Sequence, residues 1–261
     1  MSVMERNNVK IVGEGTQVIM FGHGFGCSQE MWQYIVPAFE KDYRIILFDY
    51  IGSGHSDAHF YTSERYSSLQ GYAQDVLDIV EELQLEELIF VGHSISGMIG
   101  MLAAIAKPQQ FSKLIMVGPS PCYINEGDYQ GGFEKSDIEE LLTMMEMNFT
   151  GWASYLAPVA MHEENKHHAA TLEDSFVSTN PRIAREFAEV TFFADYRHRL
   201  HELQTPTLLL QCAEDSIVPL NVGVYLQEHI KNSELQVMEA KGHYPHMSHP
   251  IETIEKIKAY I

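Results

Sequence analysis

The sequence predicts an α/β fold, in which helices cover both faces of a mostly parallel sheet. Short apolar runs rich in β-branched residues alternate with longer stretches whose apolar residues recur every three or four positions. This alternation is typical of strand–helix–strand units. It stops between Cys122 and Arg197, where no strand is evident. We therefore expect a core of residues 1–121 and 198–261, and a helical insertion of residues 122–197 that forms a lid over the carboxyl ends of the strands.

Each predicted strand is a short apolar run that ends at a loop. The six runs are Gln17–Phe21, Tyr43–Phe48, Glu87–Val91, Lys113–Val117, Thr207–Gln211 and Leu235–Met238. The predicted helices between and after them are Ser28–Phe39, Leu69–Leu83, Ile95–Ala106, Gly223–Ile230 and a last helix from Ile251. Ile95–Ala106 is apolar on nearly every side, which indicates a buried helix.

Composition excludes several classes of protein. The 261 residues carry 17 basic and 36 acidic side chains, a formal net charge of −19, which disfavours binding to nucleic acid or to an anionic membrane surface. No apolar run is long enough to span a bilayer, and the first residues do not resemble a secretory signal. The three cysteines are too scattered for a disulfide framework or a zinc site, so a reducing cytoplasm is the expected location.

The segment Gly92–Gly97, which reads GHSISG, carries the strongest catalytic signal. It lies between a predicted strand and a predicted buried helix, as a nucleophile elbow does, and Ser94 would be the nucleophile. The following helix would direct its amide dipole at that serine. The alternative is an ordinary tight turn between a strand and a helix.

A serine nucleophile needs an imidazole to accept its proton and a carboxylate to orient that imidazole. Asp215 and His243 follow the strands Thr207–Gln211 and Leu235–Met238, in the order serine, acid, histidine. Glu214, His246 and His249 are competing candidates. We favour His243 because Gly242 gives it an exposed loop position, and we expect His246 and His249 to pack around the last helix.

The loop Gly22–Gly26, which reads GHGFG, follows the first predicted long strand. Its glycines allow a backbone N–H to point into the site, so the amides of Phe25 and Ile95 are the candidate oxyanion hole. The loop lacks the lysine and hydroxyl residue of a phosphate-binding loop, which disfavours nucleotide binding.

The predicted insertion supplies the candidate pocket residues, of which about half are expected to be core. They are Phe133, Met145, Phe149, Trp152, Phe187 and Phe192. Five histidines also lie in or just after this region, but they lack a metal-binding spacing and are interpreted as solvated surface. They are His162, His167, His168, His198 and His201. No metal and no cofactor are expected.

The segments HGFG, DYIGSGHSD, FVGHS, LLLQCAED and KGHYPHMSHP together resemble the α/β-hydrolase superfamily. More narrowly they resemble the RsbQ-type bacterial stress-response regulators and the related plant strigolactone and karrikin receptors. The resemblance implies an eight-stranded sheet, a four-helix lid, and a triad of Ser94, Asp215 and His243 under an apolar cavity. Two residues depart from the bacterial pattern: His23 replaces a proline, and Ser96 is closer to the plant receptors.

Two functions follow as expectations. The first is a serine hydrolase that cleaves a small apolar ester or lactone through an acyl-enzyme. The second, implied by the resemblance, is a regulator of the general stress response that works with a PAS-domain phosphatase. A plain metabolic carboxylesterase and a slow-turnover small-molecule receptor are the alternatives. Haloalkane dehalogenase and epoxide hydrolase chemistry is disfavoured, because those relatives carry aspartate where this chain has Ser94.

Overall fold

The centre of the structure, a computed structural model that describes residues 2–261, is a seven-stranded sheet. The strand order is β1-β3-β2-β4-β5-β6-β7, and every neighbouring pair is parallel except the antiparallel pair β1 and β3. The strands are β1 Lys10–Val12, β2 Gln17–Gly22, β3 Tyr43–Leu47, β4 Leu88–His93, β5 Phe111–Val117, β6 Thr207–Glu214 and β7 Ser233–Lys241.

The eight-stranded sheet that the family resemblance implied is therefore corrected to seven strands among residues 2–261. The segment before β1 is a short helix, α1 (Val3–Arg6), and not a further edge strand. The Ser2 hydroxyl accepts the Glu5 N–H, and the Glu5 carboxylate accepts the Ser2 N–H. This reciprocal capping box stabilises the helical turn. The six predicted strands are all present, with ends shifted by up to three residues.

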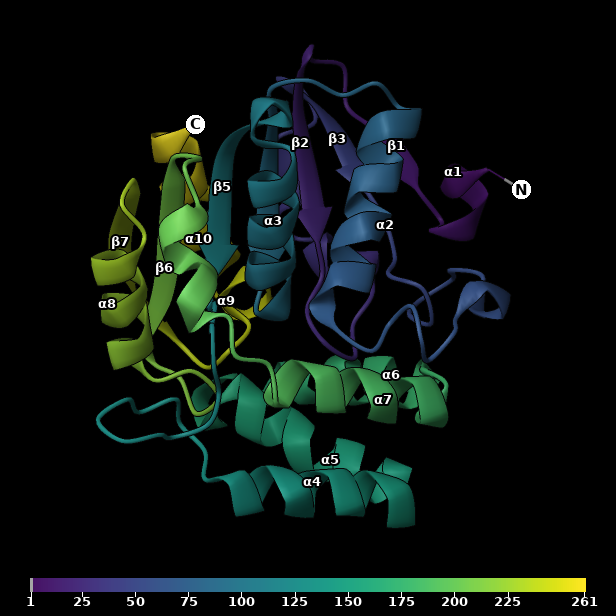
Figure 1. Ribbon diagram of the computed structural model, residues 1–261, viewed down its shortest axis with the longest axis vertical. Helices are drawn as coiled ribbons and strands as arrows, with labels where there is room; N and C mark the ends of the chain where they lie inside the picture. The colour runs from purple at the N-terminus through teal and green to yellow at the C-terminus, as the bar shows by residue number, and fades with distance from the viewer. Residues whose placement is uncertain (1) are drawn as a thin grey trace.

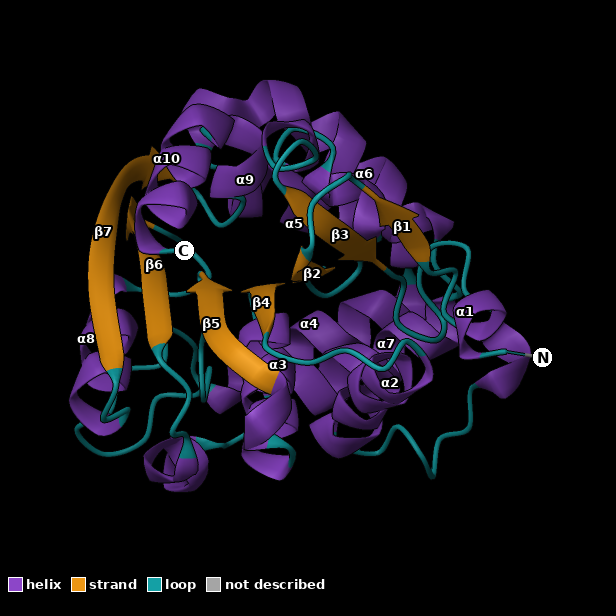
Figure 2. Cartoon of the chain, turned by 90° about the horizontal axis from the view of Figure 1, so that it is seen from above, coloured by secondary structure: helices purple, strands orange, loops and turns teal. Residues whose placement is uncertain are grey.

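Helices cover both faces of the sheet (Figure 2). One face carries α2 (Leu69–Glu82), α3 (Ile95–Ala106) and α8 (Leu220–His229), and the other carries α9 (Pro245–Ser248) and α10 (Pro250–Tyr260). Alternate residues of one strand consequently pack in different cores. Met20 of β2 belongs to the cluster with α2 and α3, whereas its neighbours Ile19 and Phe21 belong to the cluster with α10. Strands buried on both faces explain the continuous apolar runs in the sequence.

The predicted helix Ser28–Phe39 is wrong. The segment forms two short 3₁₀ turns, Gln29–Trp32 and Val36–Ala38, and the Ser28 side chain caps the first turn. Pro37 explains the difference, because a proline lacks the N–H that a continuous helix needs and its ring clashes with the preceding turn. Both turns still bury apolar side chains, including Met31 and Trp32.

Four helices lie beyond the carboxyl ends of the parallel strands (Figure 1). They are α4 (Lys135–Met147), α5 (Phe149–Met161), α6 (Ala169–Ser178) and α7 (Pro181–Phe192). The chain enters and leaves this region at one place, where Cys122 and Asp195 form an isolated bridge and the Tyr196 N–H donates to the Pro121 carbonyl at 2.8 Å. We call residues 122–197 the helical insert. That it moves as a lid stays a prediction.

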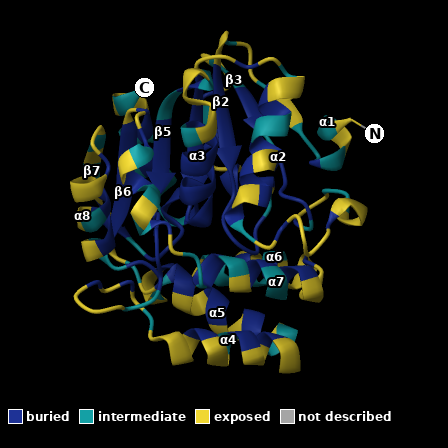
Figure 3. Ribbon diagram, in the orientation of Figure 1, coloured by how far each residue is buried: buried dark blue, intermediate teal, exposed yellow. Residues whose placement is uncertain are grey.

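Burial follows this layering (Figure 3). The strands and the sheet-facing sides of α2 and α3 are buried, and the helices of the insert expose their outer sides. No helix within residues 2–261 is both long and apolar enough to cross a membrane.

Candidate active site

Ser94 occupies a strained turn between β4 and α3. Its backbone has φ 55° and ψ −122°, a positive φ that residues other than glycine rarely adopt. Gly92 permits the turn, because a Cβ at that position would lie 2.5 Å from the Ser96 carbonyl oxygen. The Ser94 N–H donates to the Val117 carbonyl of the adjacent strand at 2.7 Å, which fixes the turn to the sheet. Strain of this kind is characteristic of functional sites.

The structure brings Ser94, His243 and Asp215 into one hydrogen-bonded chain. His243 Nε2 lies 2.8 Å from Ser94 Oγ, and His243 Nδ1 lies 2.8 Å from Asp215 Oδ2. All three side chains are buried. If Nδ1 donates to the carboxylate, Nε2 is free to accept the serine proton, which is the tautomer that a general base requires.

The two adjacent carboxylates at the end of β6 have different surroundings. The Asp215 side chain is fully buried, and its Oδ1 accepts the N–H groups of Ile217 and Val218 at 2.8 and 3.1 Å. Glu214 is largely exposed and forms an ion pair with Lys241 at 3.1 Å. The geometry therefore selects Asp215 as the partner of His243.

The competing histidines lie elsewhere. His246 is buried, with its ring centroid 4.5 Å from that of Trp32 and 4.4 Å from that of His93. Burial, together with the nearby His243, lowers the pKa of His246 to about 3. A neutral ring fits that apolar stack. The carbonyl of His249 accepts the hydroxyl of Thr253 in the first turn of α10, and His246 lies in α9, which packs against α10.

Phe25 lines the Ser94 cavity, and Ile95 is the residue that follows Ser94. Within residues 2–261 neither backbone N–H donates a hydrogen bond, so both remain candidate oxyanion donors. Ile95 begins α3, where the first N–H groups lack helical partners. Gly24 allows a close approach to the elbow, because a Cβ there would lie only 2.4 Å from His93 Nδ1.

The two residues that depart from the bacterial pattern contact each other. The Ser96 hydroxyl donates to the His23 carbonyl at 2.5 Å and also pairs with the Tyr50 hydroxyl at 2.8 Å. The His23 ring accepts the Tyr50 N–H at 3.1 Å, and its other nitrogen lies 2.9 Å from the Gly24 carbonyl. These hydrogen bonds hold the start of the candidate oxyanion loop in place.

A small cavity of about 30 Å³ opens onto Ser94. Its walls come from both the core and the insert, and most are apolar. The lining residues are Phe25, Ser94, Tyr123, Leu156, Ala160, Phe176, Thr191, Phe192, Ile217, His243 and Tyr244. The Tyr123 hydroxyl lies 3.3 Å from Ser94 Oγ, and burial raises the pKa of Tyr123, so its hydroxyl keeps its proton. A volume of this size holds one or two water molecules, so a substrate must widen it.

Of the six predicted pocket residues, only Phe192 lines this cavity. Phe187 stacks on Tyr72 with ring centroids 4.2 Å apart, and Trp152 makes an edge-to-face contact with Phe25, with ring centroids 5.9 Å apart. Phe149 stacks on Trp152, Phe133 contacts the Phe192 ring, and Met145 is buried in the core cluster. Tyr123 and Thr191 also line the cavity and were not among the predicted pocket residues. Tyr123 follows the carboxyl end of a strand, which was the one available signal.

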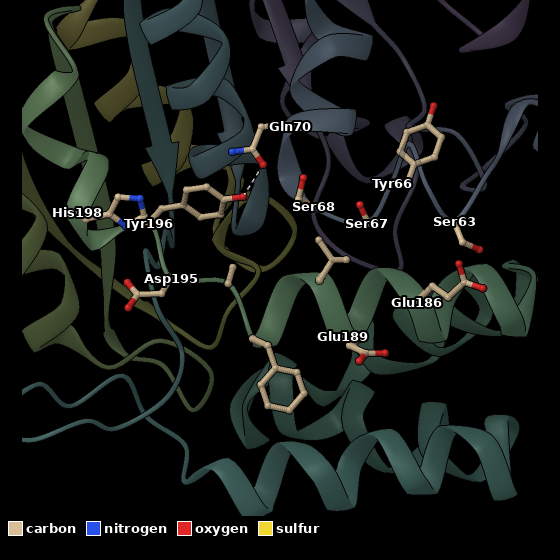
Figure 4. Close-up of a pocket in the computed structure, with 13 residues that line it drawn as sticks. Ser63, Tyr66, Ser67, Ser68, Gln70, Glu186, Glu189, Asp195, Tyr196 and His198 are labelled. Atoms are coloured by element: carbon tan, nitrogen blue, oxygen red, sulfur yellow. Dashed lines mark hydrogen bonds between the residues drawn. The ribbon is translucent and has the colours of Figure 1, made fainter.

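A larger cleft of about 820 Å³ lies on the outer side of α7 (Figure 4). It separates the insert from the segment that leads into α2, and the Tyr196 hydroxyl donates across it to Gln70 at 2.9 Å. Glu189 of α7 faces this cleft, whereas Thr191 and Phe192 of the same helix line the Ser94 cavity. The cleft contains none of the triad residues.

The surface histidines do not form a metal centre. Within residues 2–261 no group of three or more histidine, cysteine or acidic side chains has a metal-binding arrangement. The rings of His167 and His168 lie 4.1 Å apart at a tilted angle, His168 also contacts Tyr34, and His198 borders the outer cleft.

Comparison with known proteins places this geometry in a family. Residues 19–256 match the alpha/beta hydrolase family. The chain is 38% identical to the karrikin insensitive 2 receptor CA of Petunia hybrida, over 99% of this chain and 97% of that protein. It is 33% identical to a strigolactone esterase of Arabidopsis thaliana, over 98% and 97% of the two chains. The solved structure of a hydrolase from Oleispira antarctica superposes with a TM-score of 0.97 at 42% identity, over 99% of this chain and 95% of that one. The chain therefore belongs to the alpha/beta hydrolase family.

Proposed function

We propose that this protein is a serine hydrolase that cleaves small, mainly apolar esters or lactones through an acyl-enzyme. The observation that carries the proposal is the unbroken hydrogen-bonded chain from Asp215 through His243 to Ser94. It lies beside two backbone amides that have no partner within residues 2–261. A nucleophile, a base, an orienting carboxylate and an oxyanion site together satisfy the requirements of acyl transfer.

The reaction follows from these positions. Ser94 Oγ attacks the substrate carbonyl while His243 Nε2 accepts the hydroxyl proton, and the oxyanion is held by the Phe25 and Ile95 N–H groups. Collapse of the tetrahedral intermediate breaks the bond to the leaving alcohol, which takes the proton from His243. Water then attacks the acyl-enzyme with His243 again as the base, which releases the acid and restores Ser94. Asp215 holds the imidazole and stabilises its cationic form.

The cavity supports the choice of substrate class. Its walls are mostly apolar and His243 is the only lining residue that can carry a cationic charge, so an uncharged substrate fits best. The narrow space requires the helical insert to move when a substrate enters, and we therefore propose residues 122–197 as a lid. A closed lid would also exclude bulk water while the oxyanion forms.

Labelling with a fluorophosphonate probe tests the nucleophile. We expect the wild-type protein to gain one adduct by intact mass, Ser94→Ala to gain none, and the exposed-site control Ser178→Ala to react like wild type. Exposure to a panel of esters should also give a transient mass increase equal to the acyl group. Equal labelling of Ser94→Ala would refute the assignment.

A second role, as a small-molecule-responsive regulator, is favoured by the 38% identity with a plant receptor over nearly the whole chain. We propose an RsbQ-type role in which the protein acts with a PAS-domain phosphatase in the general stress response. Reconstitution with such a phosphatase from the same organism tests this, with phosphatase output as the readout. Rapid hydrolysis of common esters without any association would leave a plain carboxylesterase.

A further inference from the structure

Thr191 presents a polar atom without a partner in the candidate catalytic cavity. It lies on α7, is only 1% exposed, and lines the same cavity as Ser94. Its Oγ1 has no hydrogen-bond partner within residues 2–261. A threonine in a helix commonly bonds the carbonyl three or four residues earlier, and here that bond is not made.

The other polar side chains that line the cavity are paired. Ser94 bonds His243, Tyr123 lies within hydrogen-bond distance of Ser94, and the Tyr244 hydroxyl accepts the Cys27 thiol at 3.7 Å. A buried hydroxyl without a partner costs free energy of folding, so it marks a position where a partner is supplied. The cavity is the space from which a partner can reach this hydroxyl.

We propose that Thr191 is a specificity-determining residue that donates a hydrogen bond to a second oxygen of the substrate, apart from the scissile carbonyl. The inference rests on the proposed hydrolase function. The oxygen belongs to the acyl portion, because that portion stays attached to Ser94 inside the cavity. It is an uncharged ether or carbonyl oxygen, since Thr191 adds no charge and Phe192 and Phe176, which line the same cavity, are apolar. The substrate class is therefore an oxygen-bearing acyl ester or lactone.

Matched p-nitrophenyl esters test the proposal. One series has unbranched alkyl acyl chains, and the other has chains of equal length in which one methylene at each successive position is replaced by an ether oxygen. The values of kcat/KM are measured for wild type, Thr191→Val and Thr191→Ser. Thr171→Val, which alters an exposed threonine of α6, is the matched control.

Thr191→Val should affect the two series differently. For the ether ester with the oxygen in reach, loss of the hydrogen bond should lower kcat/KM about three- to tenfold. For the alkyl ester, removal of the unpaired hydroxyl should leave kcat/KM unchanged or raise it, because a site built around a polar contact rejects the analogue that lacks it. The ratio of kcat/KM for Thr191→Val to that for wild type is taken for each ester separately, which cancels the effect of the ether oxygen on carbonyl reactivity. Thr191→Ser should keep the preference of wild type.

Two results overturn the inference. If Thr191→Val changes both series by the same factor at every oxygen position, Thr191 is structural, and the hydrolase proposal stands. If wild type hydrolyses neither series and Ser94 does not react with the fluorophosphonate, the proposed function fails and this inference fails with it. A loss of folding in Thr191→Val would appear in its melting temperature, and Thr191→Ala, which also removes the hydroxyl, is then compared with wild type on the same two series.

Discussion

Gly24→Ala should damage catalysis by moving two catalytic loops apart. The added Cβ would lie 2.4 Å from His93 Nδ1, whereas real Cβ contacts are essentially never below 3.0 Å. The Gly24 backbone or the His93 ring must therefore move by about 0.6 Å, the difference between these two distances. The ring cannot turn away freely, because its Nε2 lies 2.7 Å from the His243 carbonyl oxygen.

Either movement reaches the reaction centre. Displacement of Gly24 shifts the neighbouring Phe25 amide, and displacement of His93 shifts the backbone of His243. A misplacement of about 1 Å can cost about 100-fold in rate, and loss of one oxyanion donor costs about 100- to 1,000-fold. We therefore expect kcat to fall about 10- to 100-fold, with a smaller change in KM.

Steady-state hydrolysis of a p-nitrophenyl ester, with thermal unfolding measured in parallel, checks this expectation. Gly127→Ala is the matched control, because a Cβ at Gly127 would meet nothing within 4 Å. Its positive φ of 58° makes alanine unfavourable for stability without affecting the site. A kcat for Gly24→Ala that equals that of wild type would refute the proposed close coupling of oxyanion loop, elbow and His243.

Three further results are expected. In the same ester assay, His243→Ala should lower kcat by about 10⁴- to 10⁶-fold, whereas kcat of His246→Phe should stay within about tenfold of wild type. A larger loss for His246→Phe than for His243→Ala would show that His243 is not the general base. Tyr123→Phe should lower kcat/KM about two- to tenfold because Ser94 loses a neutral hydrogen bond. An unchanged kcat/KM would show that the 3.3 Å contact between the Tyr123 hydroxyl and Ser94 Oγ does not contribute to catalysis. The free energy of unfolding should fall as the pH drops from the ordinary histidine pKa of about 6.5 towards the folded-state pKa of His246, about 3, because only the unfolded chain binds the proton in that range. His246→Phe should reduce the slope by up to about 1.4 kcal/mol per pH unit in urea unfolding experiments, and an unchanged slope would contradict the assigned direction.

The parts of the fold that depend on local pattern were predictable from the sequence. Strands buried on both faces give apolar runs, and the amphipathic and buried helices give their own periodicities, so α2 and α3 were placed within one residue. β1 was missed because it has three residues and no fully buried one. The predicted helix at Ser28–Phe39 failed because the Ser28 cap starts a helical turn but cannot carry a continuous helix past Pro37.

The triad was predictable for a topological reason. In a parallel sheet all carboxyl ends lie at one edge, so loops that follow β4, β6 and β7 must converge there. The pocket was not predictable, because it depends on which side of each insert helix faces inward. Phe187 and Phe192 are five residues apart on α7 and so differ by about 140° around the helix axis. Phe187 stacks on Tyr72, whereas Phe192 lines the cavity. Only tertiary packing decides that rotation.

The insert is fastened to the core through the loops that carry the candidate catalytic groups. The His243 N–H donates to the Ala160 carbonyl of α5 at 2.7 Å, and the Ser175 hydroxyl of α6 donates to the Gly26 carbonyl at 3.0 Å. Gly26 is the residue after Phe25, so these two bonds tie the insert to the histidine loop and to the oxyanion loop. Helices α5, α6 and α7 all supply residues to the cavity, so we expect a ligand that widens it to displace at least one of them. Any displacement of α5 or α6 then acts on the triad or the oxyanion site, and the reverse holds as well. Direct contacts thus link a ligand or acyl group at Ser94 to the positions of the insert helices. Both a hydrolase lid and a ligand-responsive surface require such a link.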